Sequence, residues 1–189
     1  TLSATDVEMS VDAFIGADFV VAQLEVPFEA IEQAFKIARK QNITTVLNPA
    51  PAIELPKSLL ELTDIIIPNE TEAELLTGIS INNESDMKET ATYFLDLGIS
   101  AVLITLGEQG TYCAYQEQYK MIPACNVKAI DTTAAGDTFI GAFLSELNKD
   151  LSNIESAIRL ANQASSLTVQ RKGAQASIPT RKEVEAEYN

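Results

Sequence analysis

The sequence has 189 residues, of which 46% are hydrophobic and 21% charged, a composition typical of a globular chain, and we expect residues 1–189 to form a single domain. Its 27 acidic and 13 basic side chains give a net charge of −14, which argues against nucleic acid or a membrane surface as a partner held by general electrostatics. The sequence contains no histidine, which excludes Ser–His–Asp and Cys–His nucleophiles and points to a carboxylate as any general base.

The first half of the sequence alternates helical patterns with apolar runs. Residues Thr5 and Glu8 have the spacing of a capping box, which predicts a helix whose apolar face carries Val7, Val11, Phe14 and Ile15. Apolar runs follow at 19–24, 43–47, 65–67 and 101–106, and helices are predicted around residues 31–38, 59, 70–76 and 87–95. This alternation predicts a three-layer α/β/α fold around a mainly parallel, Rossmann-like sheet with right-handed crossovers.

The pattern changes after residue 110. Residues 111–115 and 119–122 flank a turn at 116–118 and predict a β-hairpin. Two amphipathic helices follow, with apolar residues between 139 and 147 and between 154 and 168. A short helix near Glu183 is expected to end the chain.

The printed sequence carries no pattern that favours a membrane span or a signal peptide. No run of about 18 apolar residues occurs, and residues 1–15 carry Asp6, Glu8 and Asp12 where a signal peptide would be basic. The two cysteines, Cys113 and Cys125, are too few for a disulfide scaffold or a zinc site and fit a reducing compartment. We therefore expect a cytoplasmic protein.

Four apolar runs end in polar or small residues, namely Glu25, Asn48, Asn69 and Gly107. In open α/β sheets, ligands bind outside the carboxyl ends of the strands. We therefore expect these positions to line one edge of the sheet and the chemistry to lie there.

The segment from Asp131 to Phe139 carries the strongest local signal. Ala134, Ala135 and Gly136 precede an amphipathic helix, so the free N–H groups of its first turn, together with the helix dipole, form an anion site suited to phosphate. Asp137 could accept a hydroxyl proton as that hydroxyl attacks phosphorus. The alternative is an ordinary helix start in which Asp137 only complements the dipole.

Three other positions allow two interpretations each. The run Thr105–Gly110 could hold a nucleotide through its backbone or simply turn the chain into the hairpin. Asn69 and Glu72 have the spacing of a capping box, but Glu72 could also lie near a magnesium–phosphate complex and act through water. Glu25 is either a solvated strand end or a ligand for sugar hydroxyls.

Taken together, these residues resemble the ribokinase-like, or PfkB, family of ATP-dependent carbohydrate kinases. The segment 131–139 is similar to the family's C-terminal signature, and Asn69-x-x-Glu72 is similar to its N-x-x-E motif. Further similar stretches are Gln23-Leu-Glu25, Asn48-Pro-Ala-Pro-Ala52, Pro68-Asn-Glu-Thr-Glu72, Ile104-Thr-Leu-Gly107 and Arg171-Lys-Gly-Ala-Gln175.

The resemblance implies transfer of the ATP γ-phosphoryl group to the primary hydroxyl of ribose, with Asp137 as base and the backbone of Ala134, Ala135 and Gly136 as anion hole. It implies that Glu25 and Asp137 bind the sugar and that Glu72 organises Mg²⁺. The implied ATP contacts are Asn69, Thr105, Leu106, Gly107, Glu108, Gln109, Gly110, Gly136, Asp137 and Asn162. The implied ligands of a monovalent cation, usually K⁺, are Asp131, Thr133, Thr168, Arg171, Gly173 and Ser177.

Two departures from the family pattern stand out. Ala134 replaces the first glycine of a Gly-Ala-Gly-Asp sequence, which still leaves the N–H free. The resemblance begins in the middle of the family fold, so we expect this sequence to be truncated at the N-terminus and to lack the family's first strands and small β lid.

A homodimer is expected for the full-length protein, and the 189 residues alone are expected to show negligible turnover. The alternatives are another sugar or nucleoside kinase of the family, such as a fructokinase or adenosine kinase, and an inactive nucleotide-binding module.

Overall fold

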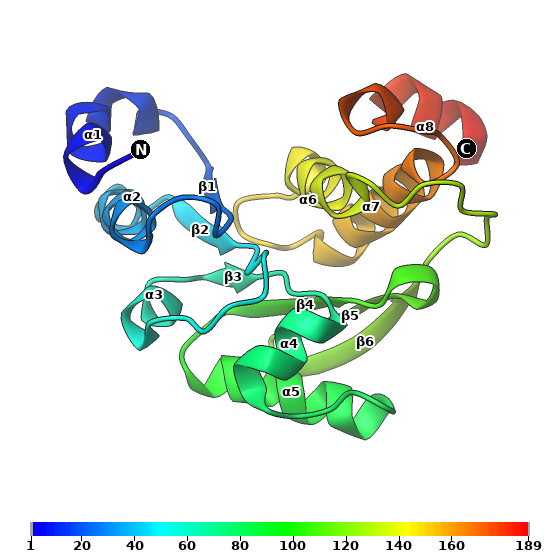
Figure 1. Ribbon diagram of the computed structural model, residues 1–189, viewed down its shortest axis with the longest axis horizontal. Helices are drawn as coiled ribbons and strands as arrows, with labels where there is room; N and C mark the ends of the chain where they lie inside the picture. Colours follow the sequence, from blue (N-terminus) through cyan, green and yellow to red (C-terminus); the bar gives the residue numbers. More distant parts are fainter. Residues whose placement is uncertain (1, 189) are drawn as a thin grey trace. The chain divides into compact units, whose positions relative to one another are not determined.

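A computed structural model describes residues 2–188 (Figure 1). In this range the strands form one sheet in the order β1-β2-β3-β4-β5-β6, and β1 to β4 are parallel. The predicted mainly parallel sheet is confirmed. The strands are β1 (Phe19–Ala22), β2 (Thr44–Leu47), β3 (Ile65–Ile66), β4 (Ala101–Thr105), β5 (Gly110–Tyr115) and β6 (Gln118–Pro123).

The helices also lie close to the predicted positions. They are α1 (Ala4–Met9), α2 (Phe28–Lys40), α3 (Lys57–Glu61), α4 (Glu70–Thr77), α5 (Glu84–Asp96), α6 (Ala135–Glu146), α7 (Ile154–Thr168) and α8 (Arg181–Tyr188). None of the helices between residues 2 and 188 is long and apolar enough to cross a membrane.

The start of the first helix differs from the prediction. Ser3, not Thr5, is the N-cap, because the Ser3 Oγ accepts the Asp6 N–H at 3.2 Å while the Asp6 carboxylate accepts the Ser3 N–H at 2.8 Å. Aspartate thus takes the place that the capping box usually gives to glutamate. The helix ends at Met9, and of the expected apolar face only Val7 is buried, whereas Ile15 is 73% exposed.

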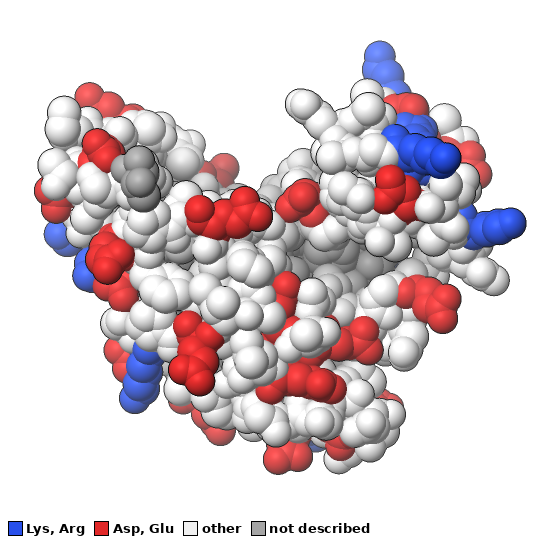
Figure 2. All heavy atoms as spheres, in the orientation of Figure 1, with Lys and Arg blue, Asp and Glu red and all other residues white. Residues whose placement is uncertain are grey.

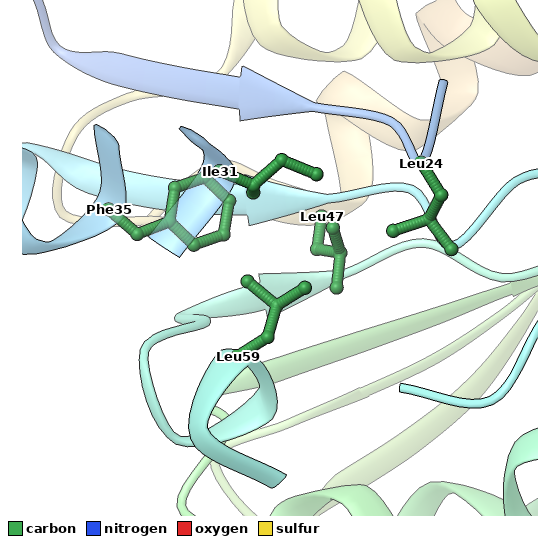
Figure 3. Close-up of a cluster of buried hydrophobic side chains, with 5 residues drawn as sticks. All are labelled: Leu24, Ile31, Phe35, Leu47 and Leu59. Atoms are coloured by element: carbon green, nitrogen blue, oxygen red, sulfur yellow. The ribbon is translucent and has the colours of Figure 1, made fainter. Parts of the chain in front are cut away.

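One hydrophobic core cluster lies between β2, α2 and α3 (Figure 3). Ile31 and Phe35 recur at helical spacing on one face of α2 and point toward Leu47 of β2 and Leu59 of α3. Leu24, just after β1, completes the cluster. Burial of each of these side chains contributes roughly 1.5–3 kcal/mol, so this packing holds β2 against α2 and α3.

The predicted hairpin consists of β5 and β6, joined at Gln116 and Glu117. Both turn residues have positive φ angles, of 49° and 61°. This is the backbone of a type I′ turn, whose twist matches that of the paired strands.

The chain separates into two compact units. The first comprises Thr1–Thr105 with Tyr112–Lys120, and the second Leu106–Thr111 with Met121–Asn189. The first unit contains 18 acidic and 6 basic residues, which gives a net charge of −12. The second unit contains 9 acidic and 7 basic residues, which gives a net charge of −2. Figure 2 accordingly shows acidic side chains spread widely over the drawn face, and basic ones mainly over α8 and over the α2–α3 side.

Candidate active site

The carboxyl ends of the parallel strands bring several predicted site residues together in the first unit. Asn69 follows β3 and forms a parallel β-bridge with Thr105, the last residue of β4. Glu25 lies exposed in the turn after β1, and Asn48 follows β2 directly. Gly107, the fourth expected position at this edge, belongs to the second unit.

Asn69 and Glu72 form the predicted capping box at the start of α4. The Asn69 Oδ1 accepts the Glu72 N–H at 2.8 Å, and the Glu72 carboxylate accepts the Asn69 N–H at 2.8 Å and its Nδ2–H at 2.9 Å. Burial raises the pKa of Glu72, and the Asn69 N–H opposes that rise. Each carboxylate oxygen accepts one of these bonds and keeps further lone pairs, so the side chain is also suited to hold a Mg²⁺-bound water.

Residues 106–110 form a tight turn after β4, as the simpler interpretation predicts. The Leu106 N–H donates to the Gly110 carbonyl at 2.8 Å, while Gly107, Glu108 and Gln109 form an exposed 3₁₀ turn. Gly110 has a φ of 112°, and a Cβ there would collide with the Ile122 carbonyl oxygen and lie 2.6 Å from the Ala124 nitrogen. Only glycine therefore fits at this close backbone approach.

The residues predicted to form an anion hole lie at the N-terminus of α6. Its N-cap, Ala134, has a φ of 61°, and no side chain caps this end. The Ala135 N–H donates to the Thr132 carbonyl at 3.2 Å, so Ala135 could bind an anion only by giving up that bond. Gly136 and Asp137 follow in the exposed first turn.

Two hydroxyls of α7 hold this helix start in place. The Ser165 Oγ donates to the Ala135 carbonyl at 2.9 Å, and the buried Thr168 Oγ1 donates to the Thr138 Oγ1 at 3.0 Å. Ser165, which was not among the predicted site residues, lies at helical spacing among the apolar residues of 154–168. Its polarity in an apolar stripe was the available signal.

Asp131 joins the loop before α6 to the loop after α7. Its carboxylate accepts the Thr133 N–H and the Gly173 N–H, both at 3.0 Å. These bonds, with that of Gly173 the strongest, lower the pKa of Asp131 to about 2. Asp131, Thr133 and Gly173 thus lie together, and their role as cation ligands stays a prediction.

The other expected cation ligands are placed less directly. The Thr168 hydroxyl is engaged with Thr138, and the buried Ser177 Oγ donates to the Ala174 carbonyl at 2.6 Å. The Arg171 side chain pairs with Glu183 at 2.7 Å. Among these expected ligands Asp131 offers the one charged oxygen donor, and the hydroxyls of Thr168 and Ser177 are already hydrogen-bonded within the chain. No cluster of three or more cysteine and carboxylate residues suited to a metal occurs between residues 2 and 188.

Asn162, an expected ATP contact, is buried and internally bonded. Its Oδ1 accepts the Thr111 hydroxyl at 3.0 Å, and its Nδ2 donates to the Ile122 and Pro123 carbonyls at 3.1 and 3.2 Å. This geometry disfavours a direct contact with ATP. It makes Asn162 a tie between α7 and the ends of β5 and β6.

Comparison with known proteins identifies the family. The model of the pfkB family carbohydrate kinases matches residues 6–181. The chain belongs to the pfkB family. A ribokinase of Staphylococcus aureus is 62% identical over 97% of this chain and 60% of its own length, and a Salmonella typhimurium deoxyribokinase is 34% identical over 95% and 58%.

The solved structures agree with the family assignment. An Arabidopsis thaliana ribokinase, solved with ribose and ATP, is 31% identical and has a TM-score of 0.89 over 95% of this chain and 58% of its own. This similarity confirms the predicted three-layer, ribokinase-like α/β fold. The chain spans about 60% of the length of these Staphylococcus and Arabidopsis ribokinases.

Proposed function

We propose that this chain is the nucleotide-binding and catalytic-base part of a pfkB kinase that transfers the γ-phosphoryl group of ATP to the primary hydroxyl of D-ribose. The observation that carries the proposal is the uncapped start of α6, where Gly136 and Asp137 lie exposed in the first turn. The sequence match to a ribokinase over nearly the whole chain supports the choice of reaction.

Asp137 is the proposed general base. Its carboxylate takes the proton from the sugar hydroxyl as that oxygen bonds to the γ-phosphorus and the bond to the β-phosphate oxygen breaks. The Gly136 N–H and the dipole of α6 stabilise the negative charge that builds on the transferred group. Ser165 supports this arrangement because it holds the Ala135 carbonyl and thereby the first turn.

The proposed nucleotide contacts are Asn69, Thr105 and the exposed 107–109 turn. Asn162 acts through Thr111 and the hairpin end instead of touching ATP. Glu72 would hold Mg²⁺ through water, and this cation, when bound with ATP, would neutralise phosphate charge. Local backbone donors and this cation explain how a chain with a net charge of −14 can bind a polyphosphate.

K⁺ is proposed to bind between the loops that Asp131 joins, with oxygen donors from Asp131, Thr133, Thr168, Arg171, Gly173 and Ser177. Its role there is to fix the loop that leads into α6. For the whole kinase we also propose a homodimer, which sedimentation of the longer protein tests.

Ribose is the proposed sugar, with Glu25 as the carboxylate that binds its hydroxyls. The Salmonella relative acts on a deoxyribose by its name, so a panel of ribose, deoxyribose, fructose and adenosine with coupled ADP detection is the direct test. A clear preference for a substrate other than ribose would overturn this part of the proposal.

The base assignment is tested by Asp137→Ala in a protein that carries this chain together with the N-terminal part of its relatives. We expect turnover to fall by about 10²–10⁴-fold, since that is the usual contribution of a general base, with ATP affinity nearly unchanged. Glu155→Gln is the matched control because Glu155 also lies in the first turn of a helix, α7. Turnover of the Asp137 variant within about tenfold of the parent, or about 1.4 kcal/mol, would show that Asp137 is not the base.

A further inference from the structure

The hydrogen-bond ladder between β2 and β3 stops where proline enters. Leu47 lies opposite Ile66, and the Ile67 N–H donates to the Leu47 carbonyl at 2.9 Å. In a parallel pair the next bond would run from the N–H of residue 49 to the Ile67 carbonyl. Residue 49 is proline, which has no N–H to give.

The side chain of Asn48 makes this missing bond. Its Nδ2 donates to the Ile67 carbonyl at 2.7 Å, and its Oδ1 accepts the Gln23 Nε2–H at 2.8 Å. The Asn48 N–H also donates to the Ala22 carbonyl at 3.0 Å. One amide that is only 9% exposed therefore ties together the carboxyl ends of β1, β2 and β3.

The residues that this amide holds lead directly to two predicted ligand-binding positions. Gln23 lies two residues before Glu25, and the Leu24 N–H between them donates to the Ala50 carbonyl at 2.8 Å. Ile67 lies two residues before Asn69, and the intervening Pro68 carbonyl accepts the Thr105 N–H at 2.9 Å. The turns that carry Glu25 and Asn69 thus share Asn48 as a common anchor.

We propose that Asn48 and Gln23 are positioning residues, which fix the Glu25 turn and the Asn69 turn in one geometry for ligand binding. The assignment rests on the proposed function for the roles of Glu25 and Asn69. The bridge that Asn48 forms between the carboxyl ends of β1, β2 and β3 rests only on the hydrogen bonds given above.

A purely structural role would predict something different. Thr45, three residues earlier in β2, is also buried, and its Oγ1 donates to the Leu62 carbonyl at 2.7 Å and lies 2.9 Å from the Asp64 carboxylate. Those partners lie at the amino-terminal approach to β3, away from the two turns. Thr45→Val therefore serves as a matched control that weakens the same strands without touching the proposed bridge.

The first test is hydrogen exchange of single amides in the 189-residue chain, read by NMR and normalised to the core amide of Val46. Asn48→Leu should speed exchange at both Leu24 and Ile67 by about tenfold, or about 1.4 kcal/mol, as expected for one lost buried hydrogen bond. Gln23→Met should speed exchange at Leu24 alone. Thr45→Val should affect Asp64, whose N–H donates to Thr45, and neither turn.

The second test is binding of Mg²⁺–ATP to the same variants by calorimetry, below their melting temperatures. Asn48→Leu should weaken binding by about tenfold, while Thr45→Val should stay within about threefold of the parent. Unchanged exchange at Leu24 and Ile67 in Asn48→Leu, or equal changes in Thr45→Val, would overturn the positioning role. A parent chain that binds no ATP would overturn the proposed function, and the exchange pattern would then still decide on the bridge.

Discussion

The two helices α4 and α6 begin in opposite ways. At α4, the side chains of Asn69 and Glu72 close the N-terminus with three hydrogen bonds. At α6, no side chain caps the N-terminus, and the backbone enters through Ala134 in the left-handed region. Loop and helix contacts from Asp131 and Ser165 hold the second start in place.

The difference shows how a helix N-terminus is assigned to stability or to ligand binding. A closed cap satisfies the donors of the first turn within the chain. An open first turn, held from its flanks, leaves its donors and its dipole for an anion. The following three changes test this contrast, from the largest expected effect to the smallest.

Breaking the closed start should have the largest effect. Glu72→Ala removes two hydrogen bonds to a carboxylate, and we expect it to lower the free energy of unfolding by about 1–2 kcal/mol. The loss is no larger because burying the Glu72 carboxylate, which raises its pKa, has a free-energy cost that offsets part of the stabilisation from these hydrogen bonds. Urea denaturation measures it.

Glu70→Ala is the control for this change, since Glu70 is an exposed acidic residue in the same first turn. It should cost no more than about 0.5 kcal/mol, the usual size of a dipole interaction at the surface. Equal losses for the two variants would mean that the closed cap adds nothing beyond charge.

Relaxing the open start should stabilise the protein. Ala134→Gly relieves the left-handed strain of an L-residue, about 1–2 kcal/mol, but adds chain entropy to the unfolded state. We expect the free energy of unfolding, measured by thermal denaturation, to rise by about 0.5–1 kcal/mol. Ala135→Gly, one residue on and inside the helix, should instead lower stability, so a gain there would contradict the strain argument.

Removing the Asp131 carboxylate, which holds the loop before α6, should have the smallest effect, because its hydrogen bonds are largely exposed to solvent. The pKa of Asp131 is lowered to about 2 from an ordinary 3.8. Its contribution is therefore complete above about pH 4 and is lost as the pH falls toward 2. Asp131→Asn should flatten this acid limb in melting temperatures measured between pH 6 and 2.5, and a limb as steep as the parent's would exclude the anchor.

The fold could be predicted well because its strands carry strong local patterns. Runs such as Ile65–Ile66 and Ala101–Thr105 are apolar throughout and flanked by amphipathic helices, so their period and order predict a parallel sheet. The cap of the N-terminal helix was predicted wrongly because two overlapping box spacings occur, Ser3 to Asp6 and Thr5 to Glu8, and the structure uses the first.

The candidate site could be predicted in part. The capping box of Asn69 and Glu72 is local, so its spacing alone predicted it. The burial of Asn162 and the bridge made by Asn48 depend on partners 40 and 19 residues away in the chain, which no local pattern encodes. The left-handed backbone of Ala134 is imposed by the loop and helix around it, against the preference of alanine.

The turn between β5 and β6 has a consequence for how the chain folds. Type I′ turns strongly favour Asn-Gly, but here Gln116 and Glu117 both adopt positive φ angles. The backbone of this turn is therefore unfavourable for these two residues. The stability of the hairpin comes from contacts between its strands, where the ring centroids of Tyr112 and Tyr119 lie 6.5 Å apart. We therefore expect cross-strand side-chain contacts and packing against the neighbouring core, and not the turn, to supply the stability of this hairpin.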